Sequence, residues 1–271
     1  MIDLAKTLFI TDMDGTLLPA DKKLNPADIA AIEEFRCKGG HFSVATGRSL
    51  QSASQYFNEL KLDEPIILCN GGGVYDCRKK RFVWQKFVDT SAYETVKKAF
   101  EHFPNAGGEI NYSDGIKVPH MSEKEKYHLR ISYGDNYCEV PYDELSPDGW
   151  CKMLFAAEED EIPLIAEYLQ RLGNDKIEYV QSSKIFYEIL PKDCTKGHAL
   201  CVLKDKYSLD DWTVIACGDF DNDLEMIKKA DIGFAPANAQ ECIKNAADHV
   251  TEADCSNGAI AEALNYVMNV L

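Results

Sequence analysis

The chain has 271 residues, of which 45% are hydrophobic, and it carries a formal net charge of −16. That length allows one large domain or two smaller ones with a substantial core. The acidic balance argues against binding to nucleic acid or to an anionic membrane, because both need a basic surface.

The first third of the chain alternates short apolar strands with helical patterns. Asn25 is suited to cap a helix whose first residue is Pro26, and Gly39-Gly40 would stop that helix. The expected elements are a strand at 8–10, a helix from 26, a strand at 42–45, a helix at 50–60 and a strand at 66–69. Strands that alternate with helices in this way indicate βαβ units and a parallel sheet.

The last third repeats this rhythm, whereas the middle is more mixed. In the middle, Ser91 and Glu94 form a capping-box pattern. A strand at 152–156, a helix at 162–172 and a strand at 184–190 follow. After Thr195, which is suited to cap a helix, we expect a strand at 212–217, a helix through 224–227, a strand at 232–234 and helices at 240–247 and 257–270. The pattern predicts an α/β protein in which a second domain is inserted into a parallel-sheet domain.

Two aspartates follow the first apolar strand, in the segment DMDGTLL. Residues i and i+2 of an extended chain project to the same side, so Asp12 and Asp14 are expected to reach one site past the end of the strand. Open α/β sheets bind their ligands at this edge. Two adjacent carboxylates repel each other unless a cation lies between them or one of them holds a proton. Taken alone, the segment could also be an aspartate-rich turn that caps a helix.

A second acidic cluster, GDFDND at residues 218–223, also follows an apolar strand. The carboxyl ends of neighbouring parallel strands lie at one edge of a sheet, so Asp219 and Asp223 are expected close to the first pair. Carboxylate oxygens with room for water are the ligands that Mg²⁺ prefers. A solvated helix cap would explain one or two acids, but not two clusters that both lie at strand ends.

Polar and cationic groups follow two other predicted strands. ATGR ends the second strand with Thr46, Gly47 and Arg48, and TKG places Lys196 in the first turn of a helix. A lysine is unfavourable at a helix N-terminus unless an anion lies there. Because polar groups also follow the neighbouring strands, we interpret Lys196 as part of an anion site. Arg48 could equally be a surface arginine at the start of a helix.

The four segments, in this order, resemble the haloacid dehalogenase (HAD) superfamily of aspartyl-phosphate phosphatases. DMDGTLL, VATGR, CTKGHAL and GDFDND resemble its motifs I to IV, and the C-terminal segment DIGFAPANAQECIKNAADHVTEADCSNGAIAEAL resembles the Cof-type subfamily of sugar-phosphate phosphatases. Pro236-Ala237 departs from the methionine and glycine usual in relatives. The resemblance implies a Rossmann-like parallel-sheet core at 1–84 and 190–271, with helices on both faces. It also implies an inserted α+β cap of the C2 type (subclass IIB) at 85–189.

The resemblance also implies roles for individual residues. Asp12 would be the nucleophile, and Asp14 would protonate the departing alkoxide and later deprotonate water. Mg²⁺ would be held by a carboxylate oxygen of Asp12, the backbone carbonyl of Asp14, and Asp219. Asn222 and Asp223 would support the metal site as orienting groups. Thr46 would bind a phosphoryl oxygen and Lys196 would neutralise charge in the transition state.

The groups expected to bind substrate are less sharply defined. They are Thr46, Gly47, Arg48, Asn70, Lys196 and Asn222, with Asn70 opening the segment NGGG. The cap would recognise the leaving group. Its polar candidates are Lys117, His120, Arg130, Lys152, Tyr187 and Glu188, each of which could instead be structural.

The sequence therefore predicts a Mg²⁺-dependent phosphatase of small phosphorylated metabolites, with sugar phosphates as the expected substrates. A phosphomutase of the same superfamily and a non-catalytic phosphosugar-binding protein are the alternatives. The presence of Asp14 argues against a non-catalytic binding protein, because binding alone does not need a general acid. We expect a monomer or weak homodimer.

The expected location is the cytoplasm. The 10 cysteines are scattered without a CxxC pair, which favours reduced thiols over a disulfide framework. The sequence shows neither a signal-peptide pattern nor an apolar run approaching the length of a membrane span.

Overall fold

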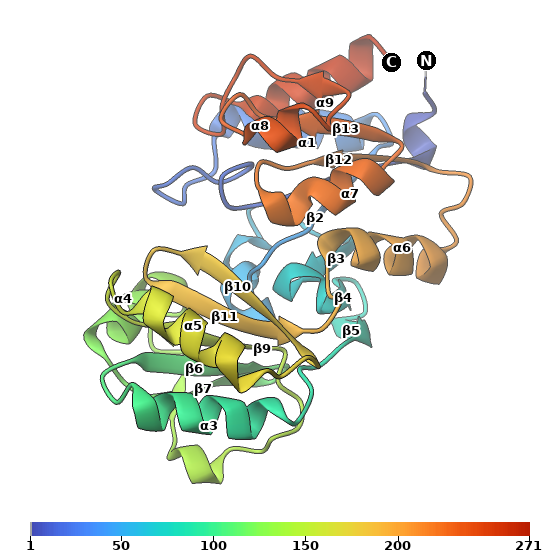
Figure 1. Ribbon diagram of the computed structural model, residues 1–271. Coiled ribbons are helices and arrows are strands. Elements are labelled where there is room, and N and C mark those ends of the chain that lie inside the picture. The colour runs from blue at the N-terminus through green and yellow to red at the C-terminus, as the bar shows by residue number, and fades with distance from the viewer. Residues whose placement is uncertain (1) are drawn as a thin grey trace. The chain divides into compact units, whose positions relative to one another are not determined.

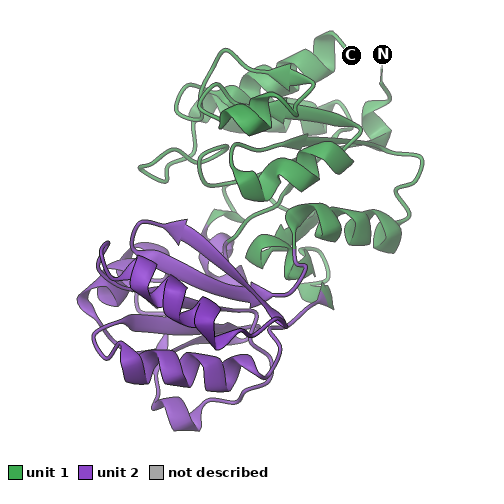
Figure 2. Ribbon diagram, viewed as in Figure 1, with its two compact units in different colours: residues 1–47, 56–84, 195–271 green, residues 48–55, 85–194 purple. Residues whose placement is uncertain are grey.

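The computed structural model describes residues 2–271 and divides the chain into two compact units (Figure 2). Of the described residues, unit 1 comprises 2–47, 56–84 and 195–271, and unit 2 comprises 48–55 and 85–194. Most of the middle of the chain therefore forms a unit of its own. The assignment of a catalytic role to one part and a cap role to the other stays a prediction.

Unit 1 contains a five-stranded sheet in which every neighbouring pair of strands is parallel. Its order is β14-β13-β12-β1-β2. The strands are β1 (Thr7–Thr11), β2 (His41–Val44), β12 (Thr213–Cys217), β13 (Ile232–Ala235) and β14 (His249–Val250). All five residues of β1 are buried, as expected for a central strand covered on both faces. The predicted parallel sheet is thus confirmed.

Helices cover both faces of this sheet (Figure 1). They are α1 (Pro26–Cys37), α6 (Lys196–Tyr207), α7 (Leu224–Lys229), α8 (Glu241–Lys244) and α9 (Ala259–Asn269), with short 3₁₀ turns at Leu4–Lys6 and Asp221–Asp223. Side chains alternate across β1: Phe9 packs against Phe35 of α1, whereas Leu8 and Ile10 belong to a core cluster with Leu200 of α6.

The helix starts in unit 1 follow the local sequence. Asn25 Oδ1 accepts the backbone N–H of Ala27 at 2.9 Å, and Pro26 occupies the first helical position. Thr195 Oγ1 accepts the backbone N–H of His198 at 2.9 Å and so caps α6. Both predicted caps are confirmed.

A three-stranded sheet of order β3-β4-β5 follows β2 in the chain. Its strands are β3 (Pro65–Leu68), β4 (Gly73–Asp76) and β5 (Arg81–Gln85), with a 3₁₀ turn at Cys69–Gly71 between the first two. A single bridge from Ala45 to Ile67 joins the end of β2 to β3 in parallel. That bridge places the turn after β3 next to the segment that follows β2.

Unit 2 is built on a six-stranded sheet of order β10-β11-β9-β6-β7-β8, in which β7 and β8 are parallel and the other pairs are antiparallel. The strands are β6 (Gly107–Tyr112), β7 (Gly115–His120), β8 (Cys138–Glu139), β9 (Lys152–Ala156), β10 (Ile177–Ser183) and β11 (Phe186–Pro191). The helices are α2 (Leu50–Ala53), α3 (Ala92–His102), α4 (Glu123–Ser132) and α5 (Ile162–Leu172), with 3₁₀ turns at Ser54–Tyr56, which ends in unit 1, and at Tyr142–Glu144. This is the predicted α+β insertion.

Several predicted elements are wrong in length or detail. The helix expected at 50–60 ends at Ala53, where Ser54 Oγ donates to Gln51 O at 2.8 Å and so competes with the helical pattern. The helix expected at 240–247 contains only α8, which ends in a tight turn. Ser91 makes no side-chain cap, because its hydroxyl donates to Asp89 at 2.6 Å instead.

One face of the sheet in unit 2 carries a buried group of charged and polar side chains that the sequence analysis did not predict. Ile110 points into the core shared with α3 and α5, whereas its neighbours Glu109 and Asn111 belong to the opposite face. Asn111 Nδ2 donates to Glu109 Oε1 at 2.8 Å. Lys152 and Glu188, two of the predicted cap candidates, form a buried pair at 3.3 Å in the same unit. Their expected role in recognising the leaving group stays a prediction.

Helix α4 adds Glu125 and His128 to this buried group. Burial, reinforced by the neighbouring Glu109 carboxylate, raises the pKa of Glu125 well above its usual range. Burial opposes ionisation of Glu109 as well. The contact with His128 outweighs burial, so the pKa of Glu109 is lowered. His128 Nε2 lies 3.5 Å from Glu109 Oε1. Glu125 is therefore the neutral member of the carboxyl pair and Glu109 the charged one.

This arrangement predicts how stability depends on pH. Above the ordinary glutamate pKa, the unfolded chain releases the Glu125 proton while the folded chain keeps it, so this group lowers stability as pH rises towards its folded pKa. Replacing Glu125 by glutamine removes that dependence. We expect the free energy of unfolding of Glu125→Gln to rise relative to that of wild type between pH 5 and pH 8. The gain is about 1.4 kcal/mol per pH unit, wherever the folded chain keeps this proton and the unfolded chain has lost it.

The measurement is urea unfolding of both proteins at the two pH values. Glu123→Gln is the matched control, because Glu123 lies on the same helix with an exposed side chain. An equal response of the two variants to pH would contradict the assignment of a buried neutral Glu125.

Candidate active site

Asp12 lies directly after β1, at the carboxyl edge of the parallel sheet. Its backbone N–H donates to Cys217 O at 2.8 Å, so the pairing of β1 with β12 continues through this residue. The carboxyl group is almost fully buried, with 5% of the residue exposed. The sheet register therefore holds Asp12 beside the loop that follows β12.

That loop brings two further carboxylates to Asp12. Asp223 Oδ2 accepts the backbone N–H groups of Asp219 at 3.0 Å and Phe220 at 3.2 Å, which folds the loop back on itself. Carboxylate oxygens of Asp12, Asp219 and Asp223 all lie within 4.8 Å of one another. The predicted convergence of the two acidic clusters therefore occurs in the structure for these three residues.

Lys196 provides the positive charge of this group. Its side chain is completely buried, and Nζ donates to Asp12 Oδ1 at 2.5 Å and to Asp223 Oδ1 at 2.6 Å. Burial alone would lower the pKa of Lys196, but the two carboxylates outweigh it and the pKa is raised. Lys196 is therefore charged, and its place at the N-terminus of α6 is explained by these two anions.

The carboxylates outnumber the cation. Burial, opposed by Lys196, raises the pKa of Asp12 well above its usual range, and burial also raises the pKa of Asp219. One lysine balances one of three carboxylates, so a fully ionised cluster is short of positive charge.

A divalent ion fits this donor set, because hard oxygen ligands and an excess of negative charge are what Mg²⁺ needs. Asp219 Oδ1 also accepts a hydrogen bond from Thr16 Oγ1 at 2.6 Å, and a Cβ on Gly15 would meet Asp219 Oδ2 at 2.5 Å. The cradle around this carboxylate thus requires a glycine.

Asp14 has different surroundings from Asp12. Lys22 Nζ donates to Asp14 Oδ1 at 2.7 Å, and both side chains are partly exposed. Within residues 2–271, the close carboxylate group does not include the Asp14 side chain. Thr16 and Lys22 are missing from the predicted set. The DGT sequence at residues 14–16 was the available signal for Thr16, and nothing local marks Lys22.

Thr46 and Gly47 lie past the end of β2. Thr46 is fully buried, and its backbone N–H donates to Ile67 O at 2.9 Å. Gly47 lies against Asn70, since a Cβ on Gly47 would be 2.8 Å from Asn70 Oδ1. Asn222 Nδ2 donates to the same Asn70 oxygen at 3.0 Å. Four of the predicted residues thus belong to one contiguous group in unit 1.

Arg48 is grouped with unit 2, where its Nη1 donates to Ser52 Oγ at 3.2 Å. Asp221, which is outside the predicted set, accepts a hydrogen bond from Cys242 Sγ at 3.1 Å. His120 stacks on Phe100, and Lys117 lies over the ring of Tyr112. Tyr187 stacks on Tyr179 within the core cluster. The expected contacts of Arg48 and of the cap candidates with substrate stay predictions.

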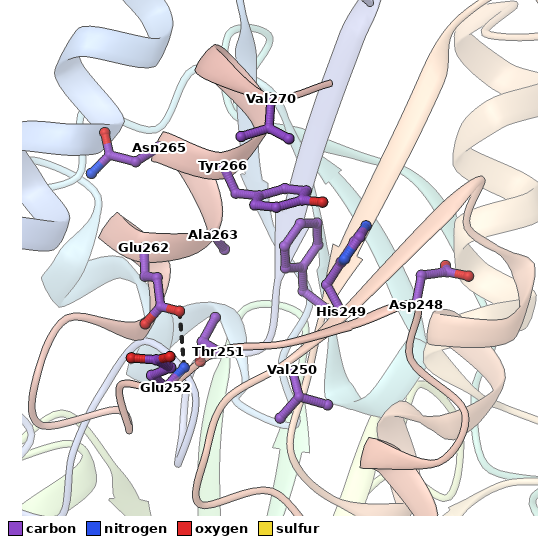
Figure 3. Close-up of a pocket in the computed structure, with 11 residues that line it drawn as sticks. Asp248, His249, Val250, Thr251, Glu252, Glu262, Ala263, Asn265, Tyr266 and Val270 are labelled. Carbon is purple, nitrogen blue, oxygen red and sulfur yellow. Dashed lines mark hydrogen bonds between the residues drawn. The ribbon is translucent and has the colours of Figure 1, made fainter.

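A cavity of about 530 Å³ lies elsewhere in unit 1 (Figure 3). His249 of β14 and Tyr266 of α9 face each other in it with ring centroids 4.5 Å apart. None of the predicted site residues lines this cavity. The chemistry of the site therefore rests on the carboxylate–lysine group and not on this cavity.

Comparison with known proteins decides the family. The sequence model of haloacid dehalogenase-like hydrolases matches residues 9–264. The chain belongs to this family. It is 27% identical over 270 residues to the 5-amino-6-(5-phospho-D-ribitylamino)uracil phosphatase YcsE of Bacillus subtilis, an alignment that covers 96% of this chain and 94% of YcsE.

Solved structures of this family share the fold. A haloacid dehalogenase-like hydrolase from Bacteroides thetaiotaomicron superposes with a TM-score of 0.85 at 23% identity, covering 96% of this chain and 99% of that one. The subclass IIB sugar phosphatase BT4131 superposes with a TM-score of 0.80 at 20% identity, covering 97% and 99%. The chain is a Cof-type phosphatase of this family.

Over residues 2–271, no helix has both the length and the apolar character needed to cross a membrane.

Proposed function

We propose that this phosphatase hydrolyses phosphate monoesters of small metabolites, sugar or polyol phosphates above all, through an aspartyl-phosphate on Asp12 and with Mg²⁺ as cofactor. The observation that carries the proposal is the buried Lys196 Nζ between Asp12 and Asp223, beside Asp219. YcsE acts on a phosphorylated ribityl compound and BT4131 is a sugar phosphatase, which supports this substrate class.

In the first step, an Asp12 carboxylate oxygen attacks phosphorus and the bond from phosphorus to the leaving alkoxide breaks. Lys196 lies against Asp12 and stabilises the charge that gathers on the phosphoryl oxygens. Asp14 gives its proton to the alkoxide, a poor leaving group that needs one. The products of this step are a phosphorylated Asp12 and a free alcohol.

In the second step, Asp14 takes a proton from water, which attacks phosphorus and releases inorganic phosphate and the Asp12 carboxylate. Thr46 would donate to a phosphoryl oxygen. Asp12, Asp219 and the backbone carbonyl of Asp14 would hold Mg²⁺, with Asn222 and Asp223 as supporting groups. When bound, the ion would supply positive charge for the phosphoryl oxygens.

The test is phosphate release from a panel of sugar phosphates, polyol phosphates, nucleotides and cofactor phosphates, with Mg²⁺ and with excess EDTA. We expect release that needs Mg²⁺ and favours sugar or polyol phosphates. Release that persists undiminished in EDTA would contradict the metal assignment, and release confined to nucleotides would contradict the substrate class.

A further inference from the structure

The turn between β3 and β4 has an unusual backbone. Cys69, Asn70 and Gly71 follow one another with φ angles of +51°, +53° and +100°. Residues other than glycine avoid this region, and asparagine is among those that tolerate it best. Such strain persists only where surrounding contacts enforce it, and it gathers at functional sites. We refer to these three residues as the corner.

The first contact of the corner is with the segment of Thr46. Asn70 N–H donates to Thr46 O at 3.0 Å, and Thr46 N–H donates to Ile67 O at 2.9 Å. Both backbone polar groups of Thr46 are therefore bound to the chain leading through the corner. The position of the Thr46 hydroxyl depends on this attachment.

The second contact is with the segment of Lys196. A Cβ on Gly71 would lie 2.1 Å from Thr195 O and 3.0 Å from Lys196 N. Both are backbone atoms. Unlike the end of a flexible side chain, they cannot move aside without shifting the chain. The corner thus lies directly against the start of α6, the point from which Lys196 reaches Asp12 and Asp223.

The third contact is with the loop after β12. Asn222 Nδ2 donates to Asn70 Oδ1 at 3.0 Å across a separation of 152 residues. Asn222 is the neighbour of Asp223, which binds Lys196. The corner therefore touches three separate segments of the chain, each of which carries one member of the proposed site.

We infer that the corner is a positioning device for phosphoryl transfer: Asn70 and Gly71 hold the segments of Thr46, Lys196 and Asp223 at the spacing that the reaction needs. This inference rests on the proposed function. Misplacement of a reacting group by about 1 Å can cost about 10²-fold in rate, so a device that sets this spacing acts on kcat. This inference assigns Asn70 a positioning role through its contacts with Thr46 and Asn222.

Gly71→Ala tests the inference, with Gly39→Ala as the matched control. Gly39 also lies in unit 1 and has φ +97°, nearly that of Gly71, but its nearest neighbour, Ala5, would be at an ordinary 3.7 Å. Both variants carry the same backbone strain, and only Gly71→Ala displaces the start of α6. We expect kcat to fall about 10-fold or more in Gly71→Ala, with a smaller change in KM, and to stay within about twofold in Gly39→Ala.

A second readout does not depend on activity. Hydrogen exchange followed by mass spectrometry is expected to show faster exchange of the amides at 195–198 in Gly71→Ala than in Gly39→Ala. Equal exchange and equal kcat in the two variants would overturn the inference. A wild-type protein that releases no phosphate would reject the proposed function instead, and the exchange comparison would still decide the role of the corner.

Asn70→Gly provides a variant that adds no bulk and keeps the backbone contact with Thr46. It removes the side-chain amide that binds Asn222 and lies against Gly47. In a double-mutant cycle with Asn222→Ala, we expect the losses in kcat to be non-additive, because each change removes the same hydrogen bond. Strictly additive losses would contradict the positioning role, even if Gly71→Ala did not fold.

Discussion

Asp12→Asn is expected to lower phosphate release by at least about 10³-fold, because an amide nitrogen or oxygen cannot replace the carboxylate nucleophile in forming an acyl phosphate. The substitution preserves the shape of the side chain, and Lys196 keeps its contact with Asp223. Thermal stability should therefore change little. Steady-state release of inorganic phosphate and the melting temperature are the two measurements.

Asp210→Asn is the matched control for this change, since Asp210 is an exposed aspartate in a turn of the same unit. Rapid quenching of the wild-type reaction with labelled substrate should trap phosphate on the protein, and Asp12→Asn should trap none. Turnover retained by Asp12→Asn would show that another group attacks phosphorus.

Lys196→Met is expected to affect both activity and stability. It leaves Asp12 and Asp223 buried without the cation that joins them, which costs about 3–5 kcal/mol in comparable buried ion pairs. Activity should fall by about 10²-fold or more, because the charge that stabilises the phosphoryl oxygens is lost. Urea unfolding and phosphate release measure the two effects.

A double variant separates these effects. Lys196→Met combined with Asp223→Asn removes one of the two uncompensated charges, so we expect part of the stability to return while activity stays low. Lys192→Met is the control, because Lys192 forms only a partly exposed pair with Glu178. If Lys192→Met lost activity and Lys196→Met kept it, Lys192 would take over the role assigned to Lys196.

Much of the fold is encoded in short stretches of the sequence. The apolar run before Asp12 predicts a buried strand, and Asn25-Pro26 and Thr195 predict helix starts that the structure contains. These features depend on a residue and its close neighbours, which is why a local pattern reveals them. The local pattern fails at Ser91, where an equally local competitor, Asp89, takes the hydroxyl.

The sequence by itself determined most strands and helices of unit 1, but not β4, β5 and β14. It also determined the family resemblance and the residue types at the strand ends. Only the tertiary structure decided which of these residues meet. Lys196 binds Asp12 across 184 residues, and Asn222 binds Asn70 across 152. The tertiary structure also revealed the Glu109–Glu125 pair in unit 2 and the contact of Gly71 with Thr195. The physical reason is that sheet register and loop closure set such pairs, and both depend on the whole chain and not on any one segment of it.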